Sequence, residues 1–117
     1  MDDIAIYHNP RCSKSRATLD VLRKRGVEPR IVLYLETPPS AAEIEKLLKL
    51  LDVEPREILR ADEAEYAELG LGDPKLGRKA LVAAIAAHPR LLQRPIVVAN
   101  GKAAIGRPPE NVLAILD

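Results

Sequence analysis

The chain has 117 residues, a length that suits one compact domain with a single core, and 47% of them are hydrophobic. Its 18 basic and 17 acidic residues leave a net charge of +1, which argues against nucleic acid or a membrane surface as partner. The acidic start, the lack of a long apolar run and the single cysteine predict a soluble protein of the reducing cytoplasm.

The first third of the chain predicts two parallel strands joined by a helix. Residues Ile4 to His8 form a short apolar run that Asn9-Pro10 ends, which is typical of a buried strand. A helical pattern begins at about Ser13 and stops at Gly26. The run from Arg30 to Glu36 is expected to be the second strand, so the three elements form a right-handed βαβ unit.

The middle of the chain predicts helices only. Ser40 followed three residues later by Glu43 has the pattern of a capping box. An apolar stripe at helical spacing follows it, made of Ile44, Leu47, Leu48 and Leu51. Short helical turns are expected up to Gly72, and a further helix from about Gly77 to His88.

The last quarter predicts a hairpin and a closing helix. Two apolar runs flank Asn100-Gly101, the dipeptide that best suits a type I′ turn. Pro108-Pro109 then opens a helix whose apolar side would be Val112, Leu113 and Leu116.

The order of these elements predicts an α/β fold of the thioredoxin-like type. A parallel pair and an antiparallel hairpin would combine into a mixed four-stranded sheet flanked by helices. Residues 1–117 would then form a single domain, with a helical insertion at about residues 40–88.

The only cysteine, Cys12, lies where the first strand passes into the first helix. Free N–H groups and the positive end of the helix dipole favour a thiolate at such a position. The cationic neighbours His8, Arg11, Lys14 and Arg16 could act in the same direction or point into solvent. A reactive nucleophile is the favoured interpretation, and a buried structural cysteine is the alternative.

The stretch "CSKS" has the frame of a dithiol oxidoreductase motif with Ser15 in the second position. Because the chain has no second cysteine, an external thiol must resolve any adduct on Cys12, and glutathione or a glutaredoxin-type protein is the natural supplier. A phosphatase-type C-x5-R loop is not indicated, because Thr18 stands where the arginine would be.

Five stretches in order along the chain resemble the glutaredoxin-coupled arsenate reductase family, the thioredoxin-fold branch: "YHNPRCSKSR", "YLETPP", "ELGL", "RPIVV" and "GRPPENVL". The resemblance implies that Cys12 attacks arsenate and forms a covalent thiol–arsenate adduct. Glutathione would then add as co-substrate, glutaredoxin would reduce the adduct, and arsenite would leave.

The resemblance also implies roles for individual residues. Three arginines match positions that bind the oxyanion, namely Arg60, Arg94 and Arg107. His8 matches a histidine that assists the thiolate, and Ser15 matches a serine near the sulfur. Pro95 matches a proline that thioredoxin-like folds keep in the cis form facing the thiol.

Two other functions stay open on sequence grounds. One is a general glutathione-dependent thiol oxidoreductase, although a disulfide substrate would not need three arginines. The other is a monothiol redox-responsive regulator related to RNA-polymerase-binding members of the family, which would have to respond by glutathionylation. The sequence has no cluster of metal-ligand residues and no glycine-rich phosphate loop, so no bound metal, nucleotide or other cofactor is expected.

Overall fold

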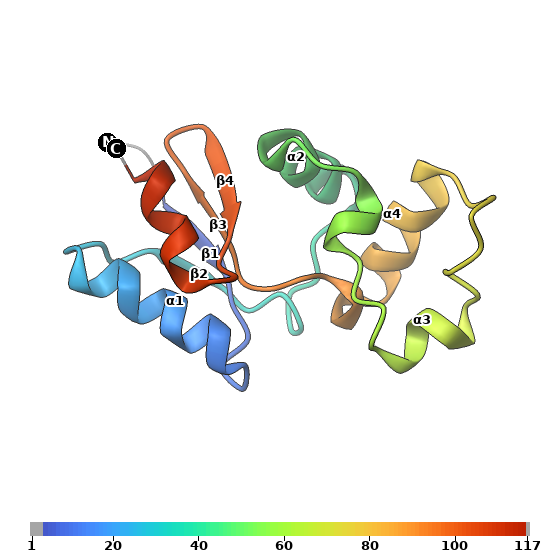
Figure 1. Cartoon of the computed structure of the whole chain (residues 1–117), viewed down its shortest axis with the longest axis horizontal. Coiled ribbons are helices and arrows are strands. Elements are labelled where there is room, and N and C mark those ends of the chain that lie inside the picture. Colours follow the sequence, from blue (N-terminus) through green and yellow to red (C-terminus); the bar gives the residue numbers. More distant parts are fainter. Residues whose placement is uncertain (1–3, 117) are drawn as a thin grey trace. The chain divides into compact units, whose positions relative to one another are not determined.

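The computed structural model describes residues 4–116, which divide into two compact units (Figure 1). The first unit contains the residues up to Thr37 and those from Arg94 onward. The second unit is Pro38–Gln93.

The first unit is built on a mixed four-stranded sheet. Its strands are β1 (Ala5–Tyr7), β2 (Arg30–Val32), β3 (Ile96–Ala99) and β4 (Lys102–Ile105), in the order β2-β1-β3-β4. Strand β1 pairs in parallel with β2 and antiparallel with β3, which pairs antiparallel with β4. The predicted α/β fold with a mixed four-stranded sheet is confirmed.

The register of the sheet gathers four chain segments at one edge. Tyr7 is opposite Val32 on one side and Ile96 on the other, and Ile96 is opposite Ile105. The residues that follow β1, β2 and β4 therefore leave the sheet at the edge where the chain enters β3. Every candidate site residue of this unit comes from these segments or from the helix that follows β1.

Two helical segments cover one face of the sheet. They are α1 (Ser13–Lys24) and the 3-10 helix η3 (Pro109–Ile115), which pack against each other (Figure 1). Their apolar side chains meet those of β1 and β3 in a core of Ile6, Leu19, Leu22, Val97, Ala99, Val112 and Ile115. Burial of these aliphatic side chains is the main force that holds helix and sheet together.

The closing helix differs from its prediction in its geometry. Because a 3-10 helix has three residues per turn, Pro109, Val112 and Ile115 share its buried side. Leu113 and Leu116, which an α-helical pattern would place on that side, are only partly buried.

The second strand is shorter than predicted. It ends at Val32, and the chain then turns, with the N–H groups of Glu36 and Thr37 bonded to the carbonyl of Leu33 at 2.9 and 2.8 Å. Because of this turn, residues 33–36 ("LYLE") do not pair with the sheet, although their apolar side chains had predicted a strand. Leu35 remains 41% exposed as a result.

The predicted hairpin is confirmed between β3 and β4. Asn100 and Gly101 have φ angles of 56° and 72°, as a type I′ turn requires. The side-chain amide of Asn100 donates to the carbonyl of Ile115 at 2.9 Å, which links the turn to η3.

The second unit contains helices and turns. They are α2 (Ala41–Leu51), η1 (Pro55–Ile58), α3 (Ala64–Glu68), α4 (Arg78–Ala87) and η2 (Pro89–Leu91). The hydroxyl of Ser40 accepts from the Glu43 N–H at 3.1 Å, as the N-cap of α2. Ile44, Leu47 and Leu48 are buried where α2 packs on α4. No helix of residues 4–116 is long and apolar enough to span a bilayer.

Candidate active site

The candidate nucleophile, Cys12, is the N-cap residue of α1 and lies at the edge of the sheet where β1 ends. Its N–H donates to the carbonyl of Asn9 at 3.0 Å, and its own carbonyl accepts from the N–H of Arg16 at 3.0 Å. These bonds fix the junction between strand and helix, so the side chain lies at the positive end of the helix dipole. Cys12 is 8% exposed, which leaves little of the residue in contact with bulk water.

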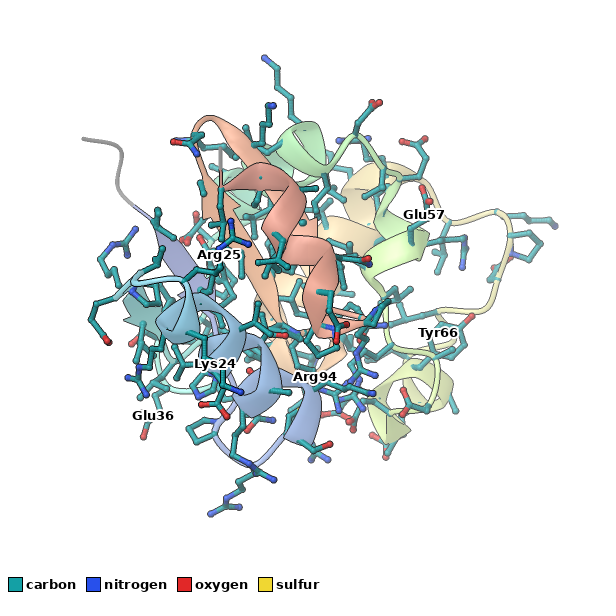
Figure 2. The ribbon with its side chains drawn as sticks, turned by 60° about the vertical axis from the view of Figure 1, so that its left-hand side comes forward. Lys24, Arg25, Glu36, Glu57, Tyr66 and Arg94 are labelled. Carbon is teal, nitrogen blue, oxygen red and sulfur yellow. The ribbon has the colours of Figure 1, made fainter. Side chains whose placement is uncertain are left out.

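Two arginines lie close to this sulfur. A terminal nitrogen of Arg107, Nη2, is 3.7 Å from Cys12 Sγ, and Arg107 Nε donates to the carbonyl of Arg94 at 2.8 Å. The positive charge of Arg94, labelled in Figure 2, also acts on the thiol. The segments before β3 and after β4 thus bring two cations to the one cysteine.

The surroundings of Cys12 act on its pKa in opposite directions. Burial is the largest single contribution and raises the pKa of the thiol. The backbone amide of Ser15, the charge of Arg94, the backbone amide of Lys14 and the charge of Arg107 all stabilise the thiolate. Together they outweigh burial, so the pKa of Cys12 lies below its ordinary value.

His8 contacts Ser15 rather than the sulfur. Its Nδ1 is 2.6 Å from the hydroxyl oxygen of Ser15, which also accepts from the N–H of Asn9 at 3.0 Å. Burial, followed by the charges of Arg23 and Arg16, lowers the pKa of His8, so the imidazole is mostly neutral at pH 7. His8 is therefore linked to the thiol through Ser15, whose backbone amide stabilises the thiolate.

The segment that carries Arg107 packs tightly against α1. A Cβ on Gly106 would lie 2.8 Å from Pro95 Cγ and closer still to the hydroxyl of Thr18. The Gly106 N–H donates to the carbonyl of Pro95 at 2.9 Å. Only glycine fits this approach, and no periodic pattern in the sequence indicates it. The predicted cis peptide bond before Pro95 is present.

Arg60 belongs to the second unit, and acidic neighbours already bind its guanidinium. It pairs with Glu63 at 2.6 Å and with Asp62 at 3.1 Å, and its side chain is 12% exposed. Arg11 and Arg16 are exposed residues of the first unit. Arg16 donates to the carbonyl of Pro10 at 2.9 Å, so its guanidinium is already bound to the backbone.

Comparison with known proteins supplies the family. The family model described as "ArsC family" matches residues 7–115, nearly the whole chain. The chain belongs to the ArsC family. The matched span includes every candidate site residue, from His8 to Arg107.

Similar proteins extend over the same length. An Escherichia coli K12 protein named "Uncharacterized protein YfgD" is 57% identical over 97% of this chain and 96% of its own. A protein of Neisseria meningitidis serogroup A named "Arsenate reductase" is 51% identical over 99% of this chain and all of its own. The structure described as arsenate reductase from Vibrio cholerae superimposes with a TM-score of 0.95 at 52% identity, and covers 97% of this chain and 98% of its own. This agreement confirms the thioredoxin-like ArsC fold.

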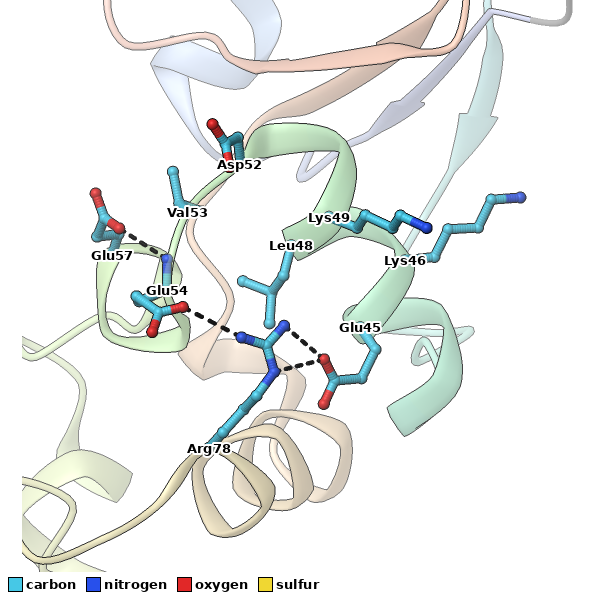
Figure 3. Close-up of a pocket in the computed structure, with 9 residues that line it drawn as sticks. All are labelled: Glu45, Lys46, Leu48, Lys49, Asp52, Val53, Glu54, Glu57 and Arg78. Atoms are coloured by element: carbon cyan, nitrogen blue, oxygen red, sulfur yellow. Dashed lines mark hydrogen bonds and ion pairs between the residues drawn. The ribbon is translucent and has the colours of Figure 1, made fainter.

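The second unit of this ArsC chain contains a cavity of about 740 Å³, whose lining lacks the reactive groups found around Cys12 (Figure 3). Arg78 crosses it and pairs with Glu45 at 2.7 Å and with Glu54 at 3.2 Å. Its lining contains neither a thiol nor an imidazole. Among residues 4–116, no three His, Cys, Asp or Glu side chains gather as a metal site would require.

Proposed function

We propose that this chain reduces arsenate to arsenite through a covalent arsenate adduct on Cys12, which glutathione and glutaredoxin resolve. Its enzyme class, arsenate reductase and hence oxidoreductase, follows from similar proteins that bear this name along their full length. The observation that carries the proposal is the pairing of the only thiol with two arginines. A thiolate and an oxyanion repel each other, and Arg94 and Arg107 offset that repulsion at the place where they must meet.

The first step joins sulfur to arsenic. The Cys12 thiolate attacks the arsenic atom, an As–S bond forms, and one As–O bond breaks as its oxygen takes up protons and leaves as water. The guanidinium groups of Arg94 and Arg107 hold the remaining oxygens. Arg60 is the proposed third arginine, and it would have to share its charge with Glu63 and Asp62.

The next steps supply the electrons. The glutathione thiol forms a second As–S bond, and another oxygen leaves as water. A glutaredoxin thiolate then attacks the glutathione sulfur, so that an S–S bond forms and the electron pair of the broken As–S bond stays on arsenic, which passes from As(V) to As(III). Water releases arsenite from Cys12 and returns its proton. The sum is arsenate and two thiols giving arsenite, one disulfide and water.

His8 and Ser15 have positioning roles in this proposal. A neutral imidazole bonded to the Ser15 hydroxyl holds the first turn of α1 in place. The amide of Ser15 is then directed at the sulfur, where it stabilises the thiolate. We propose further that residues 1–117 work as one domain.

A general glutathione-dependent thiol oxidoreductase is the second candidate. The low pKa of Cys12 suits it equally well, whereas the arginine pair at the sulfur does not serve a disulfide substrate. The same argument counts against a glutathionylated regulator.

Arsenate-dependent oxidation of NADPH distinguishes these functions. The purified chain is mixed with glutathione, glutathione reductase and glutaredoxin, and each component is then omitted in turn. The proposal predicts turnover that requires arsenate and glutathione. If NADPH oxidation does not depend on arsenate while Cys12 is readily glutathionylated, the general oxidoreductase is the better description.

A further inference from the structure

We propose that a pocket lined by Arg11, the residue directly before Cys12, binds glutathione, an inference that rests on the proposed function. The pocket has a volume of about 370 Å³, within the range of roughly 300–1,000 Å³ that holds small ligands. Residues 8–11 form one wall, and Leu33, Leu35 and Glu36 form the other. We call it the 8–11/33–36 pocket.

The topology of the sheet places this pocket across from the arginines. The walls follow β1 and β2, whose parallel pairing brings their carboxyl ends to the same edge. Arg94 and Arg107 flank β3 and β4 at that edge, on the other side of β1 in the order β2-β1-β3-β4. Cys12 directly follows the wall residue Arg11, and a guanidinium nitrogen of Arg107 is 3.7 Å from its sulfur. In this proposal, the oxyanion at the arginines and the glutathione thiol in the pocket reach the sulfur from different sides.

The pocket carries one charge of each sign, and neither is engaged. Among residues 4–116, the guanidinium of Arg11 and the carboxylate of Glu36 make no hydrogen bond or ion pair. Glutathione has two carboxylates and one ammonium group. Arg11 is suited to a carboxylate, and Glu36 to the ammonium.

The backbone holds both charged residues in place. The side chain of Asn9 accepts from the N–H of Arg11 at 3.0 Å, and the Asn9 carbonyl accepts from the N–H of Cys12. On the other wall, the N–H of Glu36 donates to the carbonyl of Leu33 at 2.9 Å. A site that is held before its ligand arrives loses less conformational entropy on binding.

Apart from the two charged residues and the polar His8 and Asn9, the lining of the pocket is apolar. Pro10, Leu33 and Leu35 line it, and Leu35 is one of the few large hydrophobic residues that is exposed, at 41%. The backbone and methylene groups of a tripeptide would cover this surface. A lining that combines apolar surface with one charge of each sign matches a zwitterionic peptide better than it matches a simple anion.

The test compares two disulfides that react with the Cys12 thiolate. Oxidised glutathione carries the charges the pocket is proposed to bind, and bis(2-hydroxyethyl) disulfide is neutral. In each case an S–S bond to Cys12 forms and a thiolate leaves, so no arsenate is needed. Second-order rate constants are measured by mass spectrometry of the wild-type chain and of Arg11→Gln. Arg25→Gln is the control, because it removes an exposed guanidinium outside the pocket (Figure 2).

We expect Arg11→Gln to slow the reaction with oxidised glutathione by about fivefold, the size of one exposed charge interaction. The reaction with the neutral disulfide should change by less than about twofold, because the thiolate itself is unaltered, and Arg25→Gln should change neither rate. Equal slowing with both disulfides, equal slowing in Arg25→Gln, or no effect of Arg11→Gln would each overturn the pocket. This test and the test of the proposed function can fail separately. Arsenate turnover without an effect of Arg11→Gln would overturn only the glutathione pocket. An effect of Arg11→Gln without arsenate turnover would overturn only the arsenate reaction.

Discussion

The sulfur of Cys12 is subject to two opposing influences, burial and cationic or amide neighbours. Burial alone would leave a protonated, inert thiol. The helix start and the two arginines reverse that outcome, and a guanidinium nitrogen of Arg107 lies 3.7 Å from Sγ. The reactivity of this residue therefore depends on side chains from distant parts of the chain.

Alkylation of Cys12 by iodoacetamide should follow the lowered pKa. Only the thiolate reacts, so the rate rises with pH through the pKa and is constant above it. Because the pKa is lowered, the plateau should be reached at a lower pH than for a free thiol, whose pKa is about 8.5. Arg107→Gln should move the midpoint to higher pH. A wild-type midpoint at or above that of a free cysteine would contradict the proposed activation.

Arg94 and Arg90 form a matched pair for testing the oxyanion site. Arg94→Ala should lower kcat/KM for arsenate by on the order of tenfold or more, as expected for a lost charge-assisted bond. Arg90 is an exposed residue that pairs with Glu63 at 3.1 Å, and Arg90→Ala should change kcat/KM by less than about twofold. Steady-state kinetics with varied arsenate measures both, and equal losses would remove Arg94 from the site.

Some features of the surroundings of Cys12 follow from the sequence, and others depend on contacts that the sequence does not contain. The strand-to-helix junction indicated an activated thiol, and the amides of α1 act as expected. The bond of His8 to Ser15 could not be read from the sequence, because the direction of a side chain depends on packing around it. The ion pairs of Arg60 lie within three residues of it, yet the same spacing occurs in many solvated turns.

At the scale of elements, the segment between β4 and η3 is positioned by a glycine. Gly106→Ala should lower the free energy of unfolding by on the order of 1–3 kcal/mol, because the new methyl group would collide with Thr18 and Pro95. It should also lower arsenate turnover by displacing Arg107. Gly77→Ala is the control, since a Cβ there has no neighbour within 4 Å. Urea unfolding measures both, and equal stability of the two variants would show that the contact at Gly106 does not matter.

Periodicity predicted the helices and the hairpin well, and failed where apolar sequence was ambiguous. Ser40, the stripe of α2 and the Asn100-Gly101 turn have the structures that their sequence indicates. The run after Val32 is as apolar as a strand, but its backbone hydrogen bonds form a turn instead of extending the sheet. Spacing alone also cannot distinguish an α-helix from the 3-10 helix that buries Ile115.

For the whole molecule, the order of elements was enough to predict the sheet. A βαβ unit followed by a hairpin has few ways to form one mixed sheet, and the observed order is one of them. The register then brings residues 8–12, 94–95 and 106–107 to one edge, although up to 95 positions separate Cys12 from Arg107. That long-range contact is the part of the site that a local pattern cannot contain.

The most direct test of the account is arsenate turnover by Cys12→Ser, measured in the coupled NADPH assay beside the wild-type chain. Circular dichroism and urea unfolding would first establish that the variant is folded. Because the chain has no other thiol, we predict that the variant has no turnover above background. A folded Cys12→Ser protein that keeps more than a few per cent of wild-type activity would contradict the covalent mechanism.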